Sequence, residues 1–365
     1  MKKLIKENAL YIYIGLFLII SYFSIYQTKD YLLPNSYLHY KQLIWYTIGI
    51  IAIFIIKKIK LEYLYKYSIY LYILNILLLF GLFFFGTEIN NSKSWYIING
   101  ISFQPSEFMK ISIILLDILL IKKFYKKKDK ISSKEEFKLL FLIILIFLIP
   151  SILTFLQPDT GSIIGYLIIT ISIIYFSNIN KKWLNIFLFS LLLFFLVFLF
   201  IYFNYQDLFI VIFGNSFFYR IDRLINWQSK SGIQLNNSLI AIGSSGLIGH
   251  SKIPLYYPEL ETDFIFTSFS SVYGFFAGLF LIMFVFSFDL YIINSIKNVH
   301  NKHDRITVFS IASLFVYQHI QNIGMTIGLL PITGITLPLI SYGGSSIISF
   351  LILIGIIEKC KEKKN

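Results

Sequence analysis

Glu107 and Lys110 combine opposite charges with a spacing of three residues, at the start of a long apolar run. That spacing places both side chains on one face of a helix, where they can pair. Lys110 lies about one turn into the run, where a charge is costly without a partner or a cavity. We therefore interpret the pair as functional or as the scaffold of a site. The plainer interpretation is a helix cap followed by a lysine whose ammonium extends to the membrane surface.

Asp263 precedes another apolar run, between Thr262 and Phe264. As a helix N-cap it would stay ionised, because the helix dipole favours the carboxylate. Partial burial against Phe264 and Phe266 would instead raise its pKa, which suits a general base. The sequence alone leaves both interpretations open.

Arg220 and Arg223 lie in the longest polar segment, and guanidinium groups bind phosphate oxygens in bidentate fashion. A local ion pair with Asp222, or contact with lipid headgroups, explains them equally well. The single cysteine, Cys360, cannot form an internal disulfide, and no Cys/His pattern indicates a metal site.

The composition identifies the elements that must hold these residues. The 365 residues are 57% hydrophobic and 14% charged, whereas a soluble domain has about 25% charged residues. This excludes a water-soluble fold, and the unbroken Ile-, Leu- and Phe-rich runs exclude the alternating pattern of a transmembrane β-barrel. We predict an all-α polytopic integral membrane protein, with residues 1–365 forming a single membrane domain.

Apolar runs bounded by charged or turn residues predict about ten transmembrane helices. Their ranges are 9–27, 42–56, 67–86, 106–121, 139–156, 160–178, 183–203, 264–296, 307–330 and 337–357. The first run follows three lysines and resembles a signal peptide, but it is long and lacks a small-residue cleavage site. We interpret it as a retained first helix.

The basic residues give the orientation. With the N-terminus inside, the inner segments hold most of the 32 lysines and arginines, and the outer loops keep only Lys29, Lys41, Lys93, Arg220, Arg223, Lys230 and Lys252. This asymmetry predicts that both termini are cytoplasmic. The net charge of +13 then reflects topology and contact with anionic inner-leaflet lipid. Nucleic acid is excluded as a partner, since the charges do not form one binding face.

Polar residues concentrate in the segments assigned to the outer face. The loop over 204–263, between the seventh and eighth spans, has about 60 residues, far more than an ordinary connection. A second segment, 87–104, ends at Gln104, and a third, 157–161, ends one span and caps the next. The glycine-rich run around Ser341 lacks the strand and Lys-Ser/Thr pattern of a nucleotide loop, and is more typical of broken helices that line a cavity.

Several short sequence motifs occur in a fixed order along the chain. They are Ser94-Trp95; Phe103 to Glu107 with Lys110; Gln157 to Gly161; Tyr219-Arg220 with Arg223; Gln234 with Ser238; Ala241 to Gly243; Pro258-Glu259 with Thr262 to Phe266; and the run from Asn322 through Pro331 to Ser346. Together they resemble the RodA/FtsW/SpoVE family, the shape, elongation, division and sporulation (SEDS) proteins of bacterial cell-wall synthesis. The string Lys41 to Trp45 and the short chain resemble the RodA branch most.

The resemblance implies an inverting peptidoglycan glycosyltransferase that polymerises lipid II at the outer face of the cytoplasmic membrane, for elongation and shape. It implies a class B penicillin-binding transpeptidase as partner. Asp263 falls on the family's essential aspartate, and Glu107 with Lys110 on its charged pair. In this reaction the 4-hydroxyl of one GlcNAc displaces a polyprenyl diphosphate from another sugar, so one carboxylate takes or orients the hydroxyl proton. Arg220, Arg223 and Lys110 are the candidate cations for the leaving diphosphate.

Gln104 and Ser341 complete the expected substrate-binding residues. A divalent cation, magnesium or manganese, is the cofactor that this chemistry admits, with no ligands assigned. The chain departs from the family at Ser271-Val272, where a Glu-Glu pair commonly precedes a short stretch ending in glycine. A lost carboxylate removes a metal ligand or a hydrogen-bond acceptor. This departure leaves open a non-catalytic SEDS scaffold acting in division or sporulation. The resemblance also leaves open a lipid II flippase, an older proposal for the family.

Overall fold

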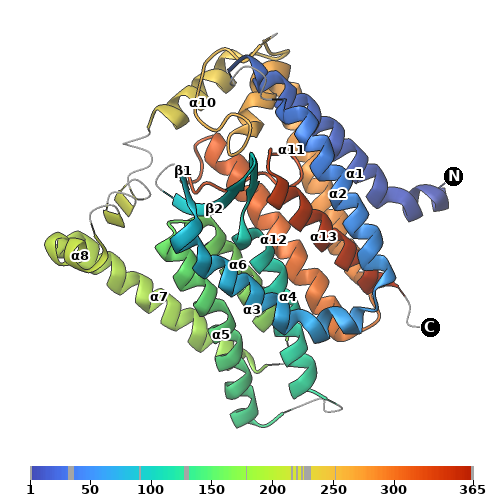
Figure 1. Ribbon diagram of the computed structural model, residues 1–365, viewed down its shortest axis with the longest axis vertical. Coiled ribbons are helices and arrows are strands. Elements are labelled where there is room, and N and C mark those ends of the chain that lie inside the picture. The colour runs from blue at the N-terminus through green and yellow to red at the C-terminus, as the bar shows by residue number, and fades with distance from the viewer. Residues whose placement is uncertain are drawn as a thin grey trace.

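The computed structural model describes residues 2–31, 37–89, 92–126, 131–177, 179–214, 217–218, 221–222, 225, 232–250 and 252–362. These residues form a bundle of long helices (Figure 1). The long helices are α1 (Lys2–Gln27), α2 (Leu38–Lys58), α3 (Leu61–Phe85), α4 (Pro105–Phe124), α5 (Ser133–Leu156), α6 (Thr160–Phe176), α7 (Lys181–Asn204), α11 (Ile265–Ser295), α12 (Lys302–Thr326) and α13 (Gly344–Lys361). Each overlaps one of the predicted ranges, and the helical class is confirmed.

Apolarity separates the outer helices from the inner ones. Among the described residues, six helices are long and apolar enough to cross a membrane, namely α1, α2, α3, α5, α7 and α11. In α7 only 11% of the most apolar window is buried, so most of its Leu and Phe side chains face outward. The more polar α4, α12 and α13 are largely enclosed by the others. Apolar side chains thus cover the outside and polar ones the centre, as a lipid environment requires.

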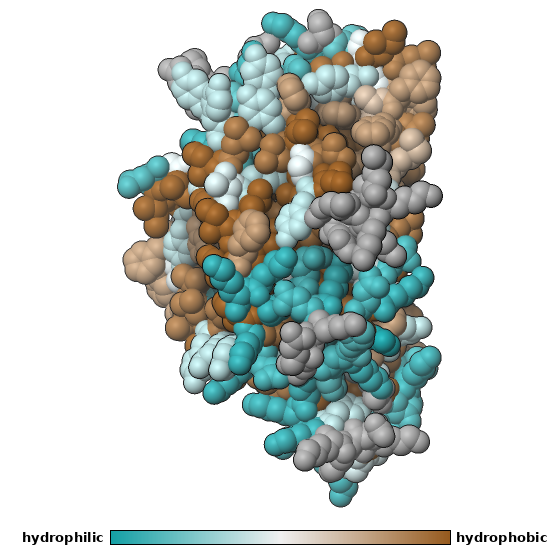
Figure 2. All heavy atoms as spheres, turned by 90° about the vertical axis from the view of Figure 1, so that its right-hand side faces the viewer, coloured by the Kyte–Doolittle hydropathy of each residue, from teal (hydrophilic) through white to brown (hydrophobic). Residues whose placement is uncertain are grey.

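Lysine side chains gather at one end of the bundle, which we call the basic end. There Lys122 of α4 pairs with Asp304 of α12 at 2.9 Å, and Lys359 of α13 donates to the carbonyl oxygen of Lys57 in α2 at 2.7 Å. Figure 2 shows a broad hydrophilic surface over this part of the molecule, next to a hydrophobic band. The helices therefore bring together lysines that are far apart in sequence.

A small antiparallel sheet, which was not predicted, covers the opposite end. Its strands β1 (Thr87–Ile89), β2 (Ser92–Ile98) and β3 (Ile101–Phe103) are adjacent in chain order. Ser92 anchors β2 by donating from its hydroxyl to the carbonyl oxygen of Gln157 at 2.7 Å. The chain passes from β3 directly into α4, so the sheet fixes where that helix begins.

The long segment 204–263 contains helices α8 (Gln206–Phe213) and α10 (Ile233–Ser244) rather than only loop. The turn after α10 packs against a kink in α11 at Gly274, whose φ of 83° favours glycine. The His250 amide donates to the Ser271 carbonyl oxygen at 3.0 Å, and the Phe275 amide to that of Gly246 at 3.0 Å. These bonds satisfy backbone groups that the kink releases, and fix α10 beside α11.

Residues 327–343 form an irregular segment between α12 and α13. The predicted span 337–357 was wrong at its start, because the helix begins only at Gly344, after Pro338 and the left-handed Leu339 (φ 63°). Donors on two other helices hold this segment: Ser21 bonds the Ile340 carbonyl oxygen at 2.7 Å and Gln42 that of Ser341 at 3.0 Å. Tyr46 binds the Leu339 carbonyl oxygen in the same way. The expected broken helix is therefore present and rigidly supported.

Candidate active site

Asp263 lies in a tight turn that leads into α11, at the end of the bundle opposite the lysines. The turn closes on itself through the Phe264 amide, which donates to the Glu259 carbonyl oxygen at 3.0 Å. Two outside residues then fix its backbone. Ser341 donates to the Thr262 carbonyl oxygen at 2.6 Å, and the Asn322 amide group to that of Asp263 at 2.8 Å. The irregular segment and α12 thus set the position of the aspartate.

The carboxyl of Asp263 is half-buried, and no described residue donates a hydrogen bond to it. Burial, together with the negative charges of Glu259, Glu261 and Asp159, raises the pKa of Asp263 to about 7. Gly334, at φ +70°, lies beside the carboxyl of Asp263. A Cβ atom added at Gly334 would lie 3.7 Å from the Oδ2 atom of Asp263. The carboxyl therefore does not serve as a helix cap, since α11 has no side-chain cap at its start.

Asp159 forms the second part of the site, at the start of α6. It caps that helix by accepting from the Ser162 amide at 3.1 Å, as the sequence indicated. Its other oxygen, Oδ2, accepts from Gln104 at 3.1 Å, Ser106 at 2.9 Å and the Ser162 hydroxyl at 2.8 Å. Since its charge also acts on Asp263, Asp159 connects the predicted Gln104 to the predicted aspartate.

Hydroxyl groups continue from this network along the starts of α4 and α13. The Gln104 amide donates to the Ser345 hydroxyl at 2.9 Å, and the hydroxyls of Thr336 and Ser346 bond each other at 3.1 Å. Thr333 lies nearby in the chain, with a buried hydroxyl that has no partner among the described residues. Neutral donors and acceptors of this kind are typical of sites that bind sugar hydroxyls.

Glu107 and Lys110 pair as the spacing predicted, but inside the bundle. The Lys110 ammonium lies 2.8 Å from both carboxylate oxygens of Glu107, and its side chain is 0% exposed. Ser349 of α13 donates to Glu107 at 3.0 Å, and the ammonium lies 4.9 Å from the centre of the Phe350 ring. The pair therefore joins α4 to α13 beneath the site, and the ammonium faces its own carboxylate rather than an open surface.

Ser341 has a positioning role in this geometry. It is 1% exposed, accepts from the Leu337 amide at 2.8 Å and donates to the Thr262 carbonyl oxygen. Arg220 and Arg223 lie outside the described residues. Among the residues that are described, no cation contributes to the pKa shift of Asp263.

Three residues that the sequence analysis did not select complete the site: Ser106, Ser162 and Asn322. Ser106 and Asn322 fall inside strings already noted there, but the spacing gave no sign of their partners. Within the described ranges, no group of three or more His, Cys, Asp or Glu side chains is arranged to hold a metal ion. The carboxylates around Asp263 interact through their charges and do not form a protein-built metal centre.

Comparison with known proteins decides the family. The model of the FtsW/RodA/SpoVE family, described as cell cycle proteins, matches residues 2–365. The chain belongs to this family. It is 31% identical to the "Probable peptidoglycan glycosyltransferase FtsW" of Wigglesworthia glossinidia brevipalpis, over 89% of this chain and 84% of that protein. It is also 31% identical to the "Peptidoglycan glycosyltransferase MrdB" of Helicobacter pylori, over 95% and 88%.

The "Stage V sporulation protein E" of Bacillus subtilis is equally similar, with 31% identity over 97% of this chain and 94% of that one. Among solved structures, RodA of Thermus thermophilus superposes with a TM-score of 0.68 at 22% identity, covering 96% of this chain and 94% of that one. A chain of "Structural coordination of polymerization and crosslinking by a peptidoglycan synthase complex" reaches 0.76 at 23%, covering 96% and 95%. These structures confirm the fold, and this FtsW/RodA/SpoVE member is a multi-pass helical membrane protein.

Proposed function

We propose that the protein is a peptidoglycan glycosyltransferase that polymerises lipid II, with Asp263 as its general base. The observation that carries the proposal is the half-buried carboxyl at the site end, with no hydrogen-bond donor among the described residues and a pKa of about 7. A base is most effective when its pKa lies near the working pH, because it is then both available and basic enough. The names of the FtsW and MrdB relatives support the same activity.

In the proposed step, the 4-hydroxyl oxygen of one GlcNAc forms a bond to the anomeric carbon of the other sugar. The bond from that carbon to the polyprenyl diphosphate breaks, and the diphosphate leaves with the electron pair. The hydroxyl proton passes to the carboxylate of Asp263. One direct displacement inverts the anomeric configuration. Because the diphosphate leaves as an anion, no second carboxyl group is needed to protonate it.

The leaving diphosphate needs positive charge, and we propose Arg220 and Arg223 for that role. Lys110 supports the site indirectly, since its ammonium is bonded to Glu107. A requirement for magnesium or manganese is a separate proposal, in which the cation arrives with the diphosphate, because the described carboxylates do not form a metal centre. Adding EDTA to the polymerisation assay, and then restoring either metal, tests it.

The decisive experiment measures polymer from labelled lipid II with purified protein in the presence of its transpeptidase partner. Asp263→Asn keeps the shape of the side chain and removes the base, so we expect at least a hundredfold loss of rate. The matched control is Asp207→Asn, which changes an exposed aspartate on α8. Polymer made by Asp263→Asn at the control's rate would refute the assignment. Vesicles that translocate lipid II without forming polymer would support the flippase instead.

The membrane topology, the protein partner and the cellular role are three separate proposals. We propose ten crossings with both termini in the cytoplasm, which reporter fusions at 204–263 and at the C-terminus can test. We propose a class B penicillin-binding protein as partner, to be tested by co-purification, since a structure of similar fold comes from a peptidoglycan synthase complex. We propose a role in elongation from the resemblance of Lys41 to Trp45 to the RodA branch. Depletion that blocks septation while cells keep elongating would contradict that role.

A further inference from the structure

The hairpin formed by β2 and β3 carries an exposed apolar tip. Its turn, Asn99-Gly100, has positive φ angles of 50° and 77°, as a tight hairpin turn requires. On either side of the turn, Ile98 and Ile101 face each other across the strands and are 67% and 52% exposed. Neighbouring apolar side chains that stay exposed in this way indicate a contact with something outside the chain.

The tip residues share one face of the hairpin with residues that pack on the bundle. In the register of the two strands, Tyr96 lies opposite Phe103, and Ile98 lies opposite Ile101. Side chains two positions apart in a strand point to the same face, so these four residues form one apolar face. The inner half of this face is packed, because the Phe103 ring stacks on Phe108 of α4 with centroids 5.2 Å apart. The outer half, at the two isoleucines, is uncovered.

Tyr96 reaches down the side of α3 from the end of the bundle that the sheet covers. Its hydroxyl donates to the Leu78 carbonyl oxygen at 2.7 Å. Gly81 makes this approach possible, since a Cβ atom added there would lie 2.5 Å from the hydroxyl oxygen. Leu74, one turn before Leu78, and Phe85, one turn beyond Gly81, lie on the same face of α3, and both are exposed. The Tyr96 ring therefore lies on a flank of α3 that otherwise faces lipid.

The length of α3 sets the depth of this contact. Its 25 residues measure about 37 Å at about 1.5 Å per residue, which is about 7 Å more than the hydrocarbon core of a bilayer. Leu78 lies seven residues before the last residue of α3, which corresponds to about 10 Å along the helix. Even if all of the excess length lies at this end, the Tyr96 hydroxyl reaches the boundary of the hydrocarbon. Ile98 and Ile101 leave the hairpin on the same side as Tyr96, so they point toward the acyl chains.

The other face of the hairpin is of mixed polarity. It carries Ser102 opposite Ile97 and, further along β2, Lys93, and all three are exposed. Charged and polar groups of this kind, like the Asn99-Gly100 turn, are tolerated among headgroups but not within hydrocarbon. The hairpin therefore fits the plane of the membrane interface, with one face toward the acyl chains and the other toward headgroups and water.

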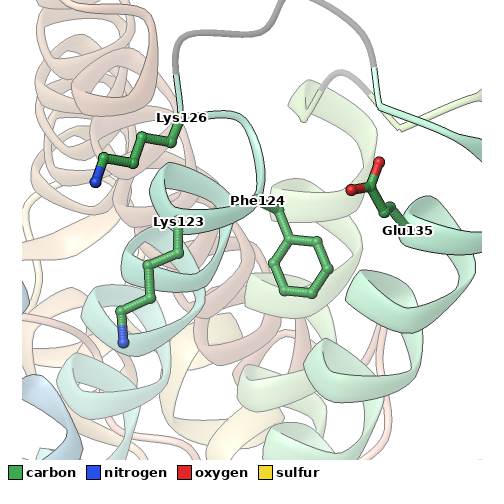
Figure 3. Close-up of a pocket in the computed structure, with 4 residues that line it drawn as sticks. All are labelled: Lys123, Phe124, Lys126 and Glu135. Carbon is green, nitrogen blue, oxygen red and sulfur yellow. The ribbon is translucent and has the colours of Figure 1, made fainter.

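The open pocket at the basic end offers no such surface. It has a volume of about 360 Å³, lies where α4 ends and α5 begins, and is lined by Lys123, Phe124, Lys126 and Glu135. Figure 3 shows the two lysine side chains extending to the side of α4 away from the Phe124 ring and Glu135. These residues do not converge on one ligand, whereas the two isoleucines of the hairpin tip share one direction.

We propose that the β2–β3 hairpin inserts Ile98 and Ile101 among the upper acyl chains of the bilayer leaflet at the end that holds Asp263. The partner is the lipid itself, because the tip continues a helix flank that faces lipid, at the depth where acyl chains begin. Gln104 links β3 to α4 and, with its neighbour Ser106, donates to Asp159. The hairpin therefore anchors this network at a fixed depth in the membrane.

The test measures the depth of spin labels on the full-length protein in phosphatidylcholine vesicles, with Cys360→Ala as the background. Ile98→Cys places the label at the tip, and Ile101→Cys repeats the measurement on the facing strand if the first variant does not fold. Oxygen concentrates among acyl chains, whereas a nickel chelate stays in water. The ratio of oxygen to nickel relaxation should therefore be severalfold higher at both positions than at Ser102→Cys. This matched control lies on the other face of the same hairpin and is also exposed.

Three outcomes would overturn the proposal. Ready access of nickel to both isoleucine positions would place the tip in water. Protection of these labels only after the transpeptidase partner is added would assign the tip to a protein contact. Equal ratios at Ile98→Cys and Ser102→Cys would mean that neither face of the hairpin is directed toward lipid. None of these measurements requires polymer synthesis, so failure here leaves the catalytic proposal untouched.

Discussion

Replacement of Lys110 by methionine tests whether the Glu107–Lys110 pair holds the bundle together. Methionine keeps an unbranched apolar stem of similar length but removes the ammonium that lies 2.8 Å from both Glu107 oxygens. Glu107 would then keep the Ser349 hydroxyl, at 3.0 Å, as its one side-chain donor among the described residues. Both side chains are almost fully enclosed, with exposures of 0% and 9%. Breaking such a buried pair from one side costs about 3–5 kcal/mol, because a charge is left without compensation.

The assay is a double-mutant cycle of Lys110→Met, Glu107→Leu and both together, followed by equilibrium unfolding in mixed micelles of SDS and a mild detergent. We expect each single change to cost about 3–5 kcal/mol and the double change less than about 2 kcal/mol, since it leaves no buried charge. The control Lys182→Met removes an exposed ammonium that lies 3.4 Å from Ser133, and should stay within about 0.5 kcal/mol of the parent protein. A cost below about 1 kcal/mol for Lys110→Met would refute the reasoning.

Two further predictions concern the turn that holds Asp263. Because burial raises its pKa from 3.8 to about 7, ionisation of Asp263 costs folding free energy: stability falls as pH rises between about 4 and 7. Asp263→Asn should therefore raise the melting temperature at pH 8 but not at pH 4, and equal shifts at both values would contradict this. Ser341→Ala removes bonds to the Leu337 amide and the Thr262 carbonyl oxygen, at a cost of about 1–3 kcal/mol. Polymerisation should lose kcat with little change in KM, and a change confined to KM would instead indicate direct substrate contact.

Much of the architecture could be predicted because one physical rule dominates it. Lipid-facing helices must be long and apolar, so the runs at 139–156 and 183–203 located α5 and α7 directly. Apolarity alone did not predict the conformation of the irregular segment, residues 327–343. Its residues are almost as apolar as a helix, but its backbone carbonyl groups bond to Ser21, Gln42 and Tyr46, which lie far away in the sequence. No local pattern records such partners, so the last span was predicted to start too early.

In the candidate site, too, the sequence predicted local features but not the contacts between helices. The pairing of Glu107 with Lys110 followed from helical spacing, but its enclosure by α13 did not. Asp159 was interpreted as a helix cap, which is correct, yet its bonds to Gln104 and Ser106 depend on how α4 packs beside α6. Asp289 packs inward opposite His319, with 2.9 Å between the ring nitrogen and a carboxylate oxygen, and this contact joins α11 to α12. Local spacing predicts which side chains share a face, whereas helix packing decides what they meet.

The support of the irregular segment by α1 and α2 also bears on how the chain is made. Ser21, Gln42 and Tyr46 leave the ribosome about 300 residues before the carbonyl groups they bind. At a synthesis rate of about 5–20 residues per second, these donors wait on the order of 15–60 s for their partners. During that interval they lie in lipid or against temporary neighbours, where an unpaired polar group is costly. Assembly of the end that holds Asp263 is therefore among the last steps of biogenesis, and an incomplete chain exposes polar groups that membrane quality control can recognise.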